Sequence, residues 1–190
     1  CMMMAVLMVL AMAACGGEPA NNGGNDTPDA TTVKIGGIGP MTGPYANYGL
    51  SEKYGAELAV KEINEAGGIN GKPIELVIYD NKGADTEAVT AFTRMVDEGV
   101  TALVGDVLTG NTLAVVGEAN AVNMPMITPS ATAAAVTVKE DGTVYSNVFR
   151  TCFIDPFQGQ KMADYAVEKL GAKTAAIFYE TGSDYSEGLK

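Results

Sequence analysis

Short apolar runs alternate with longer amphipathic stretches along the first two thirds of the chain. The runs are rich in β-branched side chains, and each leads into a loop that contains Gly, Pro, Asp or Asn. They predict strands at residues 33–39, 74–80, 101–106 and 124–128. Strands that alternate with helices on short connections predict an α/β fold, a doubly wound parallel sheet covered on both faces.

The stretches between these runs have the periodicity of helices. In residues 45–66 the apolar positions follow i, i+3, i+4 and i+7 spacing, which predicts a core-facing stripe of Ala56, Ala59, Val60 and Ile63. Asp85 is placed to cap a second helix that ends near Gly99. Its predicted core face consists of Val89, Phe92, Thr93 and Val96. A third helix is predicted over residues 110–121.

The pattern changes after residue 130. Residues 131–146 are irregular, residues 147–153 predict a fifth strand, and Asp155-Pro156 begins a helix whose apolar positions are Met162, Tyr165, Ala166 and Leu170. A further strand is predicted at residues 174–180. We therefore expect residues 33–150 to form a complete first lobe and residues 151–190 to begin a second. Two strands and one helix leave a sheet face unburied, so we expect the sequence to be part of a longer two-lobed chain.

The first 32 residues differ from the rest. Residues 2–14 are continuously apolar and end in "AMAAC", an arrangement that resembles a bacterial lipobox with Met12 where Leu is usual. We expect residues 1–15 to be a lipoprotein signal peptide that lacks its first few residues, and Cys15 to be the lipidated residue. Residues 16–32 contain no large apolar side chain, which predicts a flexible tether. The protein is therefore expected to be extracytoplasmic and anchored to the bacterial membrane by lipid.

Composition excludes several classes of function. The 12 basic and 23 acidic residues give a net charge of -11, which argues against nucleic acid or an anionic membrane surface as the main partner. The chain has no His, which excludes Ser-His-Asp and Cys-His catalysis and His-ligated metals. Its three cysteines, at positions 1, 15 and 152, have no metal-ligand spacing. We expect a protein that is not an enzyme and has no cofactor and no metal.

Three polar loops follow predicted strands that should end at one edge of the sheet. They read "GPMTGPYANYG", "GDVLTGNT" and "TPSAT", and each offers hydroxyls, glycines or backbone N–H groups near the start of a helix. Ligands of open parallel sheets bind at this edge, and helix N-termini with hydroxyls hold small anions. The loops therefore predict a site for a small carboxylate.

Enzyme-like motifs fail on spacing. A dinucleotide fingerprint starting at Gly37 would need a glycine where Thr42 stands. The stretch "AGGINGKP" has Ala66 in place of the first glycine of a P-loop and Pro73 after its lysine. Asp80 ends a strand, as a catalytic aspartate can, but the sequence offers it no partner base or nucleophile.

Four phrases distributed along residues 33–190 resemble the branched-chain amino acid (Leu/Ile/Val) type of substrate-binding protein, which has the type I periplasmic binding fold. They are "IGPMTGPYANYG", "INEAGGINGKPIELVIYDNK", "ITPSAT" and "NVFRTCFIDPFQG". The resemblance implies a two-lobed receptor, a monomer when complete, that closes on an amino acid or related carboxylate. It also implies delivery of that ligand to the membrane subunits of an ABC importer.

The resemblance also implies ligand-binding residues. They are Tyr48, Thr109, Ser130, Ala131, Thr132 and Tyr185. Of these, Thr109 and residues 130–132 would hold the ligand carboxylate, Tyr48 would form an aromatic wall, and Tyr185 would close over the ligand from the second lobe. Each also has a purely structural alternative: Tyr48 as helix packing, and Thr109 and Thr132 as helix caps. The acidic residue that grips the ligand's ammonium in the family would lie beyond Lys190.

Proteobacterial members of this type carry a disulfide in the first lobe, and the matching places here are Gly83 and Leu108. Cys152 is therefore expected to be a buried, unpaired core residue. The same fold also serves repressors and receptor ectodomains. Residues 1–32 provide no DNA-binding headpiece, so the alternative that stays open is the ligand-sensing ectodomain of a receptor.

Overall fold

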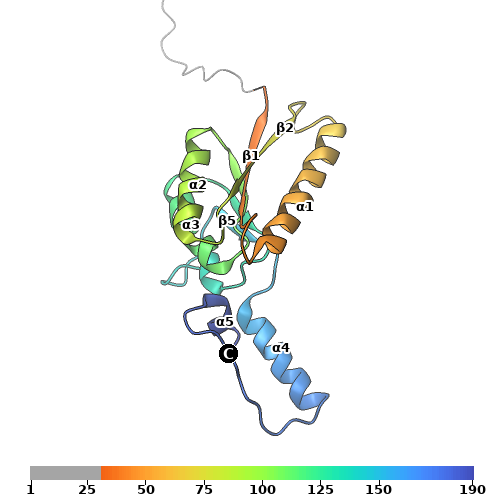
Figure 1. Ribbon diagram of the computed structural model, residues 1–190, viewed down its shortest axis with the longest axis vertical. Coiled ribbons are helices and arrows are strands. Elements are labelled where there is room, and N and C mark those ends of the chain that lie inside the picture. The colour runs from red at the N-terminus through yellow and green to blue at the C-terminus, as the bar shows by residue number, and fades with distance from the viewer. Residues whose placement is uncertain (1–30) are drawn as a thin grey trace, which may run out of the picture. The chain divides into compact units, whose positions relative to one another are not determined.

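Five parallel strands form the centre of the protein in the computed structural model, which describes residues 31–190 (Figure 1). The strands are β1 (Val33–Gly39), β2 (Ile74–Asp80), β3 (Ala102–Gly105), β4 (Met126–Thr128) and β5 (Val148–Arg150). The predicted α/β fold with a parallel sheet is thereby confirmed. The predicted signal peptide, its Cys15 and most of the predicted tether lie outside the described residues.

The strand order is β2-β1-β3-β4-β5, so the direction of winding reverses between β1 and β3. β1 pairs with β2 over its whole length, from Val33 opposite Ile74 to Gly39 opposite Asp80. On its other side β1 pairs with β3. Because all strands are parallel, their carboxyl ends meet at one edge. A crevice for a ligand is expected at that edge, where the order reverses.

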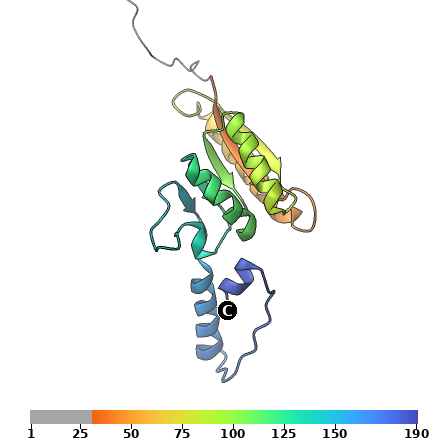
Figure 2. The same ribbon diagram turned by 90° about the vertical axis from the view of Figure 1, so that its left-hand side faces the viewer.

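Helices cover both faces of the sheet (Figures 1 and 2). α2 (Asp85–Asp97) and α3 (Thr109–Ala121) pack side by side on one face and enclose the hydrophobic core. The largest fully buried side chains of that core are Ile38, Met95, Leu103, Met126 and Val115. Asn147 connects this layer to the sheet, since its Nδ2 donates to the carbonyls of Ala119 and Met124.

α1 (Ala46–Glu65) lies on the opposite face and packs less tightly. Its predicted apolar stripe faces the sheet but lines an open groove of about 690 Å³ and leaves Ile63 40% exposed. The only buried residue of the helix is Gly49. The stripe consists mainly of small side chains, which do not fill the space between the helix and the sheet.

The predicted face of α2 is wrong by part of a turn. Its buried residues are Ala88, Ala91, Phe92 and Met95. Thr93 is exposed, and its hydroxyl donates to the carbonyl of Val89 at 3.0 Å. Small alanines let α2 lie close to α3, so they occupy the shared face. Asp85 is the first residue of the helix, not its cap, which is Ala84.

Beyond β4 the chain contains a 3₁₀ turn (Ala134–Val136), α4 (Asp155–Glu168) and α5 (Asp184–Gly188). The predicted strand at residues 174–180 is wrong. These residues form no strand, and Phe178 is fully exposed. A strand requires a neighbour to satisfy its backbone groups, and within residues 31–190 no strand pairs with this segment. The apolar residues Met162 and Tyr165 of α4 also face solvent.

Candidate functional site

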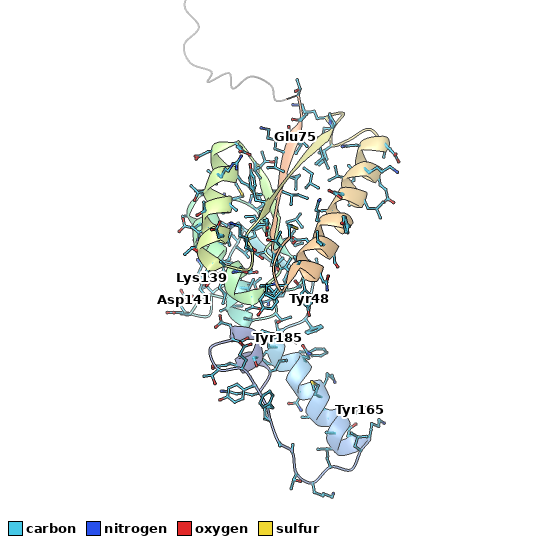
Figure 3. All side chains as sticks on the ribbon, viewed as in Figure 1. Tyr48, Glu75, Lys139, Asp141, Tyr165 and Tyr185 are labelled. Carbon is cyan, nitrogen blue, oxygen red and sulfur yellow. The ribbon has the colours of Figure 1, made fainter. Side chains whose placement is uncertain are left out.

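A cavity of about 630 Å³ lies where the loops that follow β1, β2, β3 and β4 converge. Its wall comprises Tyr45 and Tyr48, then Gly83 and Asp85, then residues 107–111, then Ser130 and Thr132, and finally Phe153, Glu180 and residues 182–185. Figure 3 shows Tyr48 on α1 and Tyr185 on α5 at this end of the sheet, with Glu75 at its opposite end. The convergence of loops predicted from the sequence is therefore present at the point where the strand order reverses.

The structure brings together five of the six residues named from the sequence. Tyr48, Thr109, Ser130, Thr132 and Tyr185 all line the cavity. Tyr48 and Tyr185 are 62% and 42% exposed, so each presents much of its ring to solvent instead of packing into the core. For Tyr48, this placement disfavours the alternative of simple helix packing.

Ala131 is the exception, because it is fully buried and does not line the cavity. Its N–H donates to the Thr128 hydroxyl at 3.0 Å, and its carbonyl accepts from Arg150 Nη1 at 3.4 Å. The backbone groups of Ala131 are therefore used to hold the loop. The sequence could not reveal this engagement, because it depends on the neighbouring strand β5.

The three hydroxyls of the "ITPSAT" loop have different positions and partners. Thr128 Oγ1 donates to the carbonyl of Asp106 at 2.7 Å, and Ser130 Oγ donates to the carbonyl of Val107 at 2.7 Å. These two bonds join the loops that follow β3 and β4. Thr132 Oγ1 is buried and makes no hydrogen bond of normal geometry within the described residues, although it lies near the Asp155 carboxyl group and lowers the pKa of that group. A buried hydroxyl without a well-formed hydrogen bond is costly, so Thr132 is the member of the loop best placed to bind a ligand.

The amino end of α3 forms a second polar part of the wall. Thr109 is the first residue of this helix and Leu108 is its N-cap, so the alternative that Thr109 is the cap is wrong. The first intrahelical bond runs from the N–H of Thr112 to the carbonyl of Leu108 at 2.9 Å. The N–H groups of residues 109–111 precede it and lack helical acceptors. They carry the partial positive charge of the helix end, which favours an anion.

Two carboxyl groups with buried oxygens lie near the carboxyl ends of β1 and β3: that of Glu52, on the groove along α1, and that of Asp106, in the loop that follows β3. Both carboxyl oxygens of Glu52 lack a hydrogen-bond partner among the described residues, and burial together with the charge of Asp106 raises the pKa of Glu52 to about 9. Burial likewise raises the pKa of Asp106 to about 7, although hydrogen bonds from Val107, Leu108 and Asn81 oppose the shift. The sequence did not single out either residue. Their proximity to each other is apparent only in the folded chain.

Asp80 has a structural role in the loop after β1. Its Oδ1 accepts from the N–H groups of Met41 and Lys82, both at 2.8 Å, and its Oδ2 accepts from the Thr42 hydroxyl at 2.5 Å. Partial burial alone would raise its pKa, but these hydrogen bonds outweigh burial and hold the pKa of Asp80 below its usual range. An ionised carboxylate that accepts hydrogen bonds from a loop fixes that loop, as expected of a scaffold residue.

Arg150 and Asp155 meet the cavity loop from the other side. Arg150 donates to the carbonyls of Ala133 at 2.8 Å and Ala134 at 3.2 Å. Asp155 is 1% exposed, and its N–H donates to the Thr132 carbonyl at 3.1 Å. Burial raises the pKa of Asp155, while Thr132 and Arg150 act in the opposite direction. Arg150 therefore offsets part of the negative charge next to Thr132.

Asp85 and Asn111 were not among the sequence-predicted site residues, yet both line the cavity. Asn111 Nδ2 donates to Asp85 Oδ1 at 2.6 Å. One signal in the sequence could have indicated Asp85: it begins a helix directly after a loop at the ligand-binding edge of the sheet. Asn111 could be found only through its contact with Asp85.

Gly83 and Leu108, the positions that correspond to the two cysteines of the family's first-lobe disulfide, are adjacent in the structure. A Cβ built on Gly83 would lie 3.7 Å from Leu108 Cδ1, so a larger side chain at position 83 would contact residue 108 in the cavity wall. Cys152 is unpaired, but the prediction that it is a buried core residue is wrong, because it is only half-buried and lies outside the core cluster. Burial raises the pKa of its thiol, and Sγ lies 3.5 Å from the Ala131 carbonyl.

Residues 31–190 contain no cluster of three or more His, Cys, Asp or Glu arranged to hold a metal ion. In the same part of the chain, every helix falls short of the length and apolar character needed to cross a membrane.

A parallel sheet with a loop-lined cavity where its strand order reverses is the architecture of a small-molecule binding lobe. Residues 32–190 match the family described as "Periplasmic binding protein", and the chain belongs to that family.

Named relatives and solved structures agree with this assignment. The leucine-, isoleucine-, valine-, threonine-, and alanine-binding protein of Pseudomonas aeruginosa is 37% identical over 160 residues, which are 84% of this chain and 42% of that protein. A branched-chain amino acid transporter substrate-binding protein from Streptococcus pneumoniae, solved with isoleucine, is 42% identical with a TM-score of 0.77, covering 83% of this chain and 44% of the other. A leucine-binding protein from Thermotoga maritima is 38% identical with a TM-score of 0.75, over 83% and 43% of the two chains. The chain thus spans less than half the length of these proteins.

Proposed function

We propose that this protein is an extracytoplasmic receptor that captures an amino acid-like ligand between two lobes and delivers it to an ABC importer. The observation that carries the proposal is the buried hydroxyl of Thr132, which makes no hydrogen bond of normal geometry within the described residues and lines the cavity. The matched relatives support the same role, because they are named as amino acid-binding proteins or as the binding components of transporters.

In this proposal the ligand carboxylate binds between Thr132 and the amino end of α3. The Thr132 hydroxyl and the backbone N–H groups of residues 109–111 would donate hydrogen bonds to it. Charge-assisted bonds of this kind are short and strong, and they need no cationic side chain. Ser130 and Ala131 would hold the loop in position.

Two aromatic residues would enclose the rest of the ligand. Tyr48 lines the cavity from α1 and Tyr185 lines it from α5. Both rings are partly exposed, and burying them against a ligand removes apolar surface from water. Tyr185 belongs to the part of the chain that begins the second lobe, so its approach to the ligand would accompany closure of the two lobes.

We also propose that the mature protein is attached to the membrane through lipid on Cys15. This rests on the apolar residues 2–14 and the "AMAAC" sequence, as does the proposed signal peptide of residues 1–15. Mass spectrometry of the N-terminal peptide should find a diacylglyceryl-modified cysteine at position 15. An unmodified cysteine, or a mature N-terminus elsewhere, would refute the assignment.

A thermal-shift screen of amino acids, followed by calorimetry on the Thr132→Val variant, tests the proposed function. Valine keeps the shape of threonine and removes the hydroxyl. A hydrogen bond to a charged group contributes roughly 1.5–3 kcal/mol, so the affinity for the best ligand should fall about 10- to 100-fold.

The stability of the unliganded variant provides the control for this experiment. Its unfolding midpoint should change little, because Thr132 Oγ1 makes no hydrogen bond of normal geometry within residues 31–190. A loss of unliganded stability with unchanged affinity would show that Thr132 only supports the loop. A complete screen in which no amino acid binds would contradict the proposed function itself.

A further inference from the structure

Two side chains meet on the cavity wall at the amino ends of neighbouring helices. Asp85 is the first residue of α2, and Asn111 lies in the first turn of α3. Asn111 Nδ2 donates to Asp85 Oδ1 at 2.6 Å, and both residues line the cavity. Asp85 is exposed, so its carboxylate is open to a ligand as well as bound to Asn111.

The amide of Asn111 has only one orientation compatible with this contact. A carboxylate accepts hydrogen bonds and cannot donate them when ionised, so the NH₂ group must face Asp85. The amide oxygen, Oδ1, then takes no part in the contact with Asp85. Asn111 is 3% exposed, and its Oδ1 has no donor among the described residues. A buried acceptor without a donor is unfavourable, which indicates that a donor group arrives from a bound molecule.

The charges around the cavity favour the same kind of group. Asp85, Glu180 and Asp184 line it, and within the described residues that form the wall there is no Lys or Arg. The hydroxyl of Thr132 and the first N–H groups of α3 suit the ligand carboxylate. Asp85 would repel a carboxylate and attract a donor, so the two ends of an amino acid-like ligand would be distinguished by charge.

We propose that Asp85 and Asn111 determine ligand selectivity by accepting hydrogen bonds from an amino, guanidino or amide group on the ligand's side chain. The inference rests on the proposed function, since it assigns a substrate class to the same cavity. It predicts an amino acid with a donor-bearing side chain as the preferred ligand, and weaker binding of purely aliphatic amino acids.

Asp85 also has a purely structural explanation. An acidic residue in the first turn of a helix stabilises the helix dipole, and Asn111 could simply join α3 to α2. In that case removing the charge of Asp85 lowers the unfolding temperature of the unliganded protein and leaves its ligand preference unchanged. Stability and selectivity must therefore be measured on the same variants.

Calorimetric titration of the full-length protein with L-arginine, L-glutamine and L-leucine tests the inference. Arginine or glutamine should bind more tightly than leucine. Asp85→Asn should weaken binding of arginine about 10- to 100-fold, as expected for loss of a hydrogen bond to a charged group, and should change leucine binding little.

Glu87→Gln is the matched control. Glu87 lies in the same first turn and has the same charge, but it is exposed, pairs with Lys82 at 3.8 Å and does not line the cavity. This variant should bind all three ligands as the unaltered protein does.

The possible outcomes separate the inference from the function on which it rests. If leucine binds the unaltered protein more tightly than arginine and glutamine, the inference is overturned while the proposed function stands. If Asp85→Asn lowers the unfolding temperature without changing the ratio of arginine to leucine affinity, Asp85 only stabilises its helix and the inference is overturned. If no amino acid binds, the proposed function fails as well.

Discussion

The carboxyl group of Glu52 lies over the ends of β1 and β3. A Cβ built on Gly39 would lie 2.6 Å from Glu52 Oε2, and one built on Gly105 would lie 2.8 Å from Oε1. A side chain at either place would displace the Glu52 carboxyl group from its position. Because no donor among the described residues reaches the carboxyl oxygens, the folded protein favours the protonated acid.

The pKa of Glu52 predicts how stability changes with pH. The folded state holds the proton up to about pH 9, whereas the ordinary value for the group is 4.5. Below pH 4.5 Glu52 is protonated in both the folded and the unfolded state, and its contribution to the free energy of unfolding is fully present. Between pH 4.5 and 9 only the unfolded state ionises, so stability falls as pH rises, by at most about 1.4 kcal/mol per pH unit for one proton.

Glu52→Gln should remove this dependence. The neutral amide has nearly the same shape, so the variant should match the unaltered protein near pH 5 and become progressively more stable than it towards pH 8. Urea unfolding at several pH values measures the difference. Glu62→Gln, an exposed position on the same helix, serves as the control. A gap between Glu52→Gln and the unaltered protein that stays constant with pH would contradict the prediction.

At the residue scale, the sequence identified the right loops but not every role within them. The resemblance drew attention to Thr132 and Ser130, and both line the cavity. Nothing in the order of residues showed that the Ser130 hydroxyl is bound to a carbonyl while that of Thr132 makes no hydrogen bond of normal geometry within the described residues. The carbonyl that Ser130 binds lies in the loop that follows β3, so this difference follows from tertiary packing alone. The pairing of Asp85 with Asn111 was missed for the same reason.

Among the helices, α1 approaches the main chain of the loop after β1 closely at Gly49. A Cβ built on Gly49 would lie 2.2 Å from the carbonyl oxygen of Pro40 and 2.6 Å from its carbonyl carbon. Both atoms are backbone, so they cannot move aside as the end of a side chain can. The position of α1 relative to the sheet, and hence of Tyr48 in the cavity wall, depends on this close approach.

Gly49→Ala should therefore destabilise the protein by about 1–3 kcal/mol, as overpacking of a closed contact does. Gly55→Ala is the matched control on the same helix, because a Cβ at that position meets nothing within 4 Å. It should stabilise the helix by up to about 1 kcal/mol through the better helix propensity of alanine. Denaturant unfolding of the two variants measures both effects. Equal changes of the same sign would show that the contact at Gly49 has no energetic role.

At the element scale, the sequence predicted most elements well. The bounds of β1 and β2 agree with the predicted runs at residues 33–39 and 74–80. Their apolar runs are bounded by clear turn residues. The failure at residues 174–180 has a different origin, because that run has strong strand propensity but no neighbouring strand among the described residues. Propensity is local, whereas strand formation needs a partner.

For the molecule as a whole, burial ends near residue 150. Every member of the hydrophobic core cluster lies between Ile38 and Val148. After Arg150 the only buried residue is Asp155. Large apolar side chains of the last forty residues are exposed instead; they include Phe153, Phe157, Met162, Leu170 and Phe178. Exposed apolar surface of this extent promotes association.

A polypeptide of residues 31–154 should consequently fold by itself. It keeps the whole core and Arg150, and its free energy of unfolding should differ from that of residues 31–190 by about 1 kcal/mol or less, since it loses few buried contacts. It should also associate less, because Phe157 and Phe178 are absent. Sedimentation velocity compares the association of the two polypeptides. An unfolded shorter polypeptide would show that α4 and α5 are needed to stabilise the sheet.

The hydroxyl bonds that join the loops after β3 and β4 have a consequence for redesign. Thr128 and Ser130 both donate to carbonyls of the main chain, at Asp106 and Val107. Every amino acid supplies a main-chain carbonyl, so a different side chain at position 107 would still leave the hydrogen bond from Ser130 an acceptor. Leu108 and Gly83, which also line the cavity, take no part in these bonds. An engineer converting this lobe into a biosensor for another metabolite can therefore randomise position 108 while keeping Thr128 and Ser130 as a fixed frame, and should keep Gly83, whose φ of 76° disfavours any side chain.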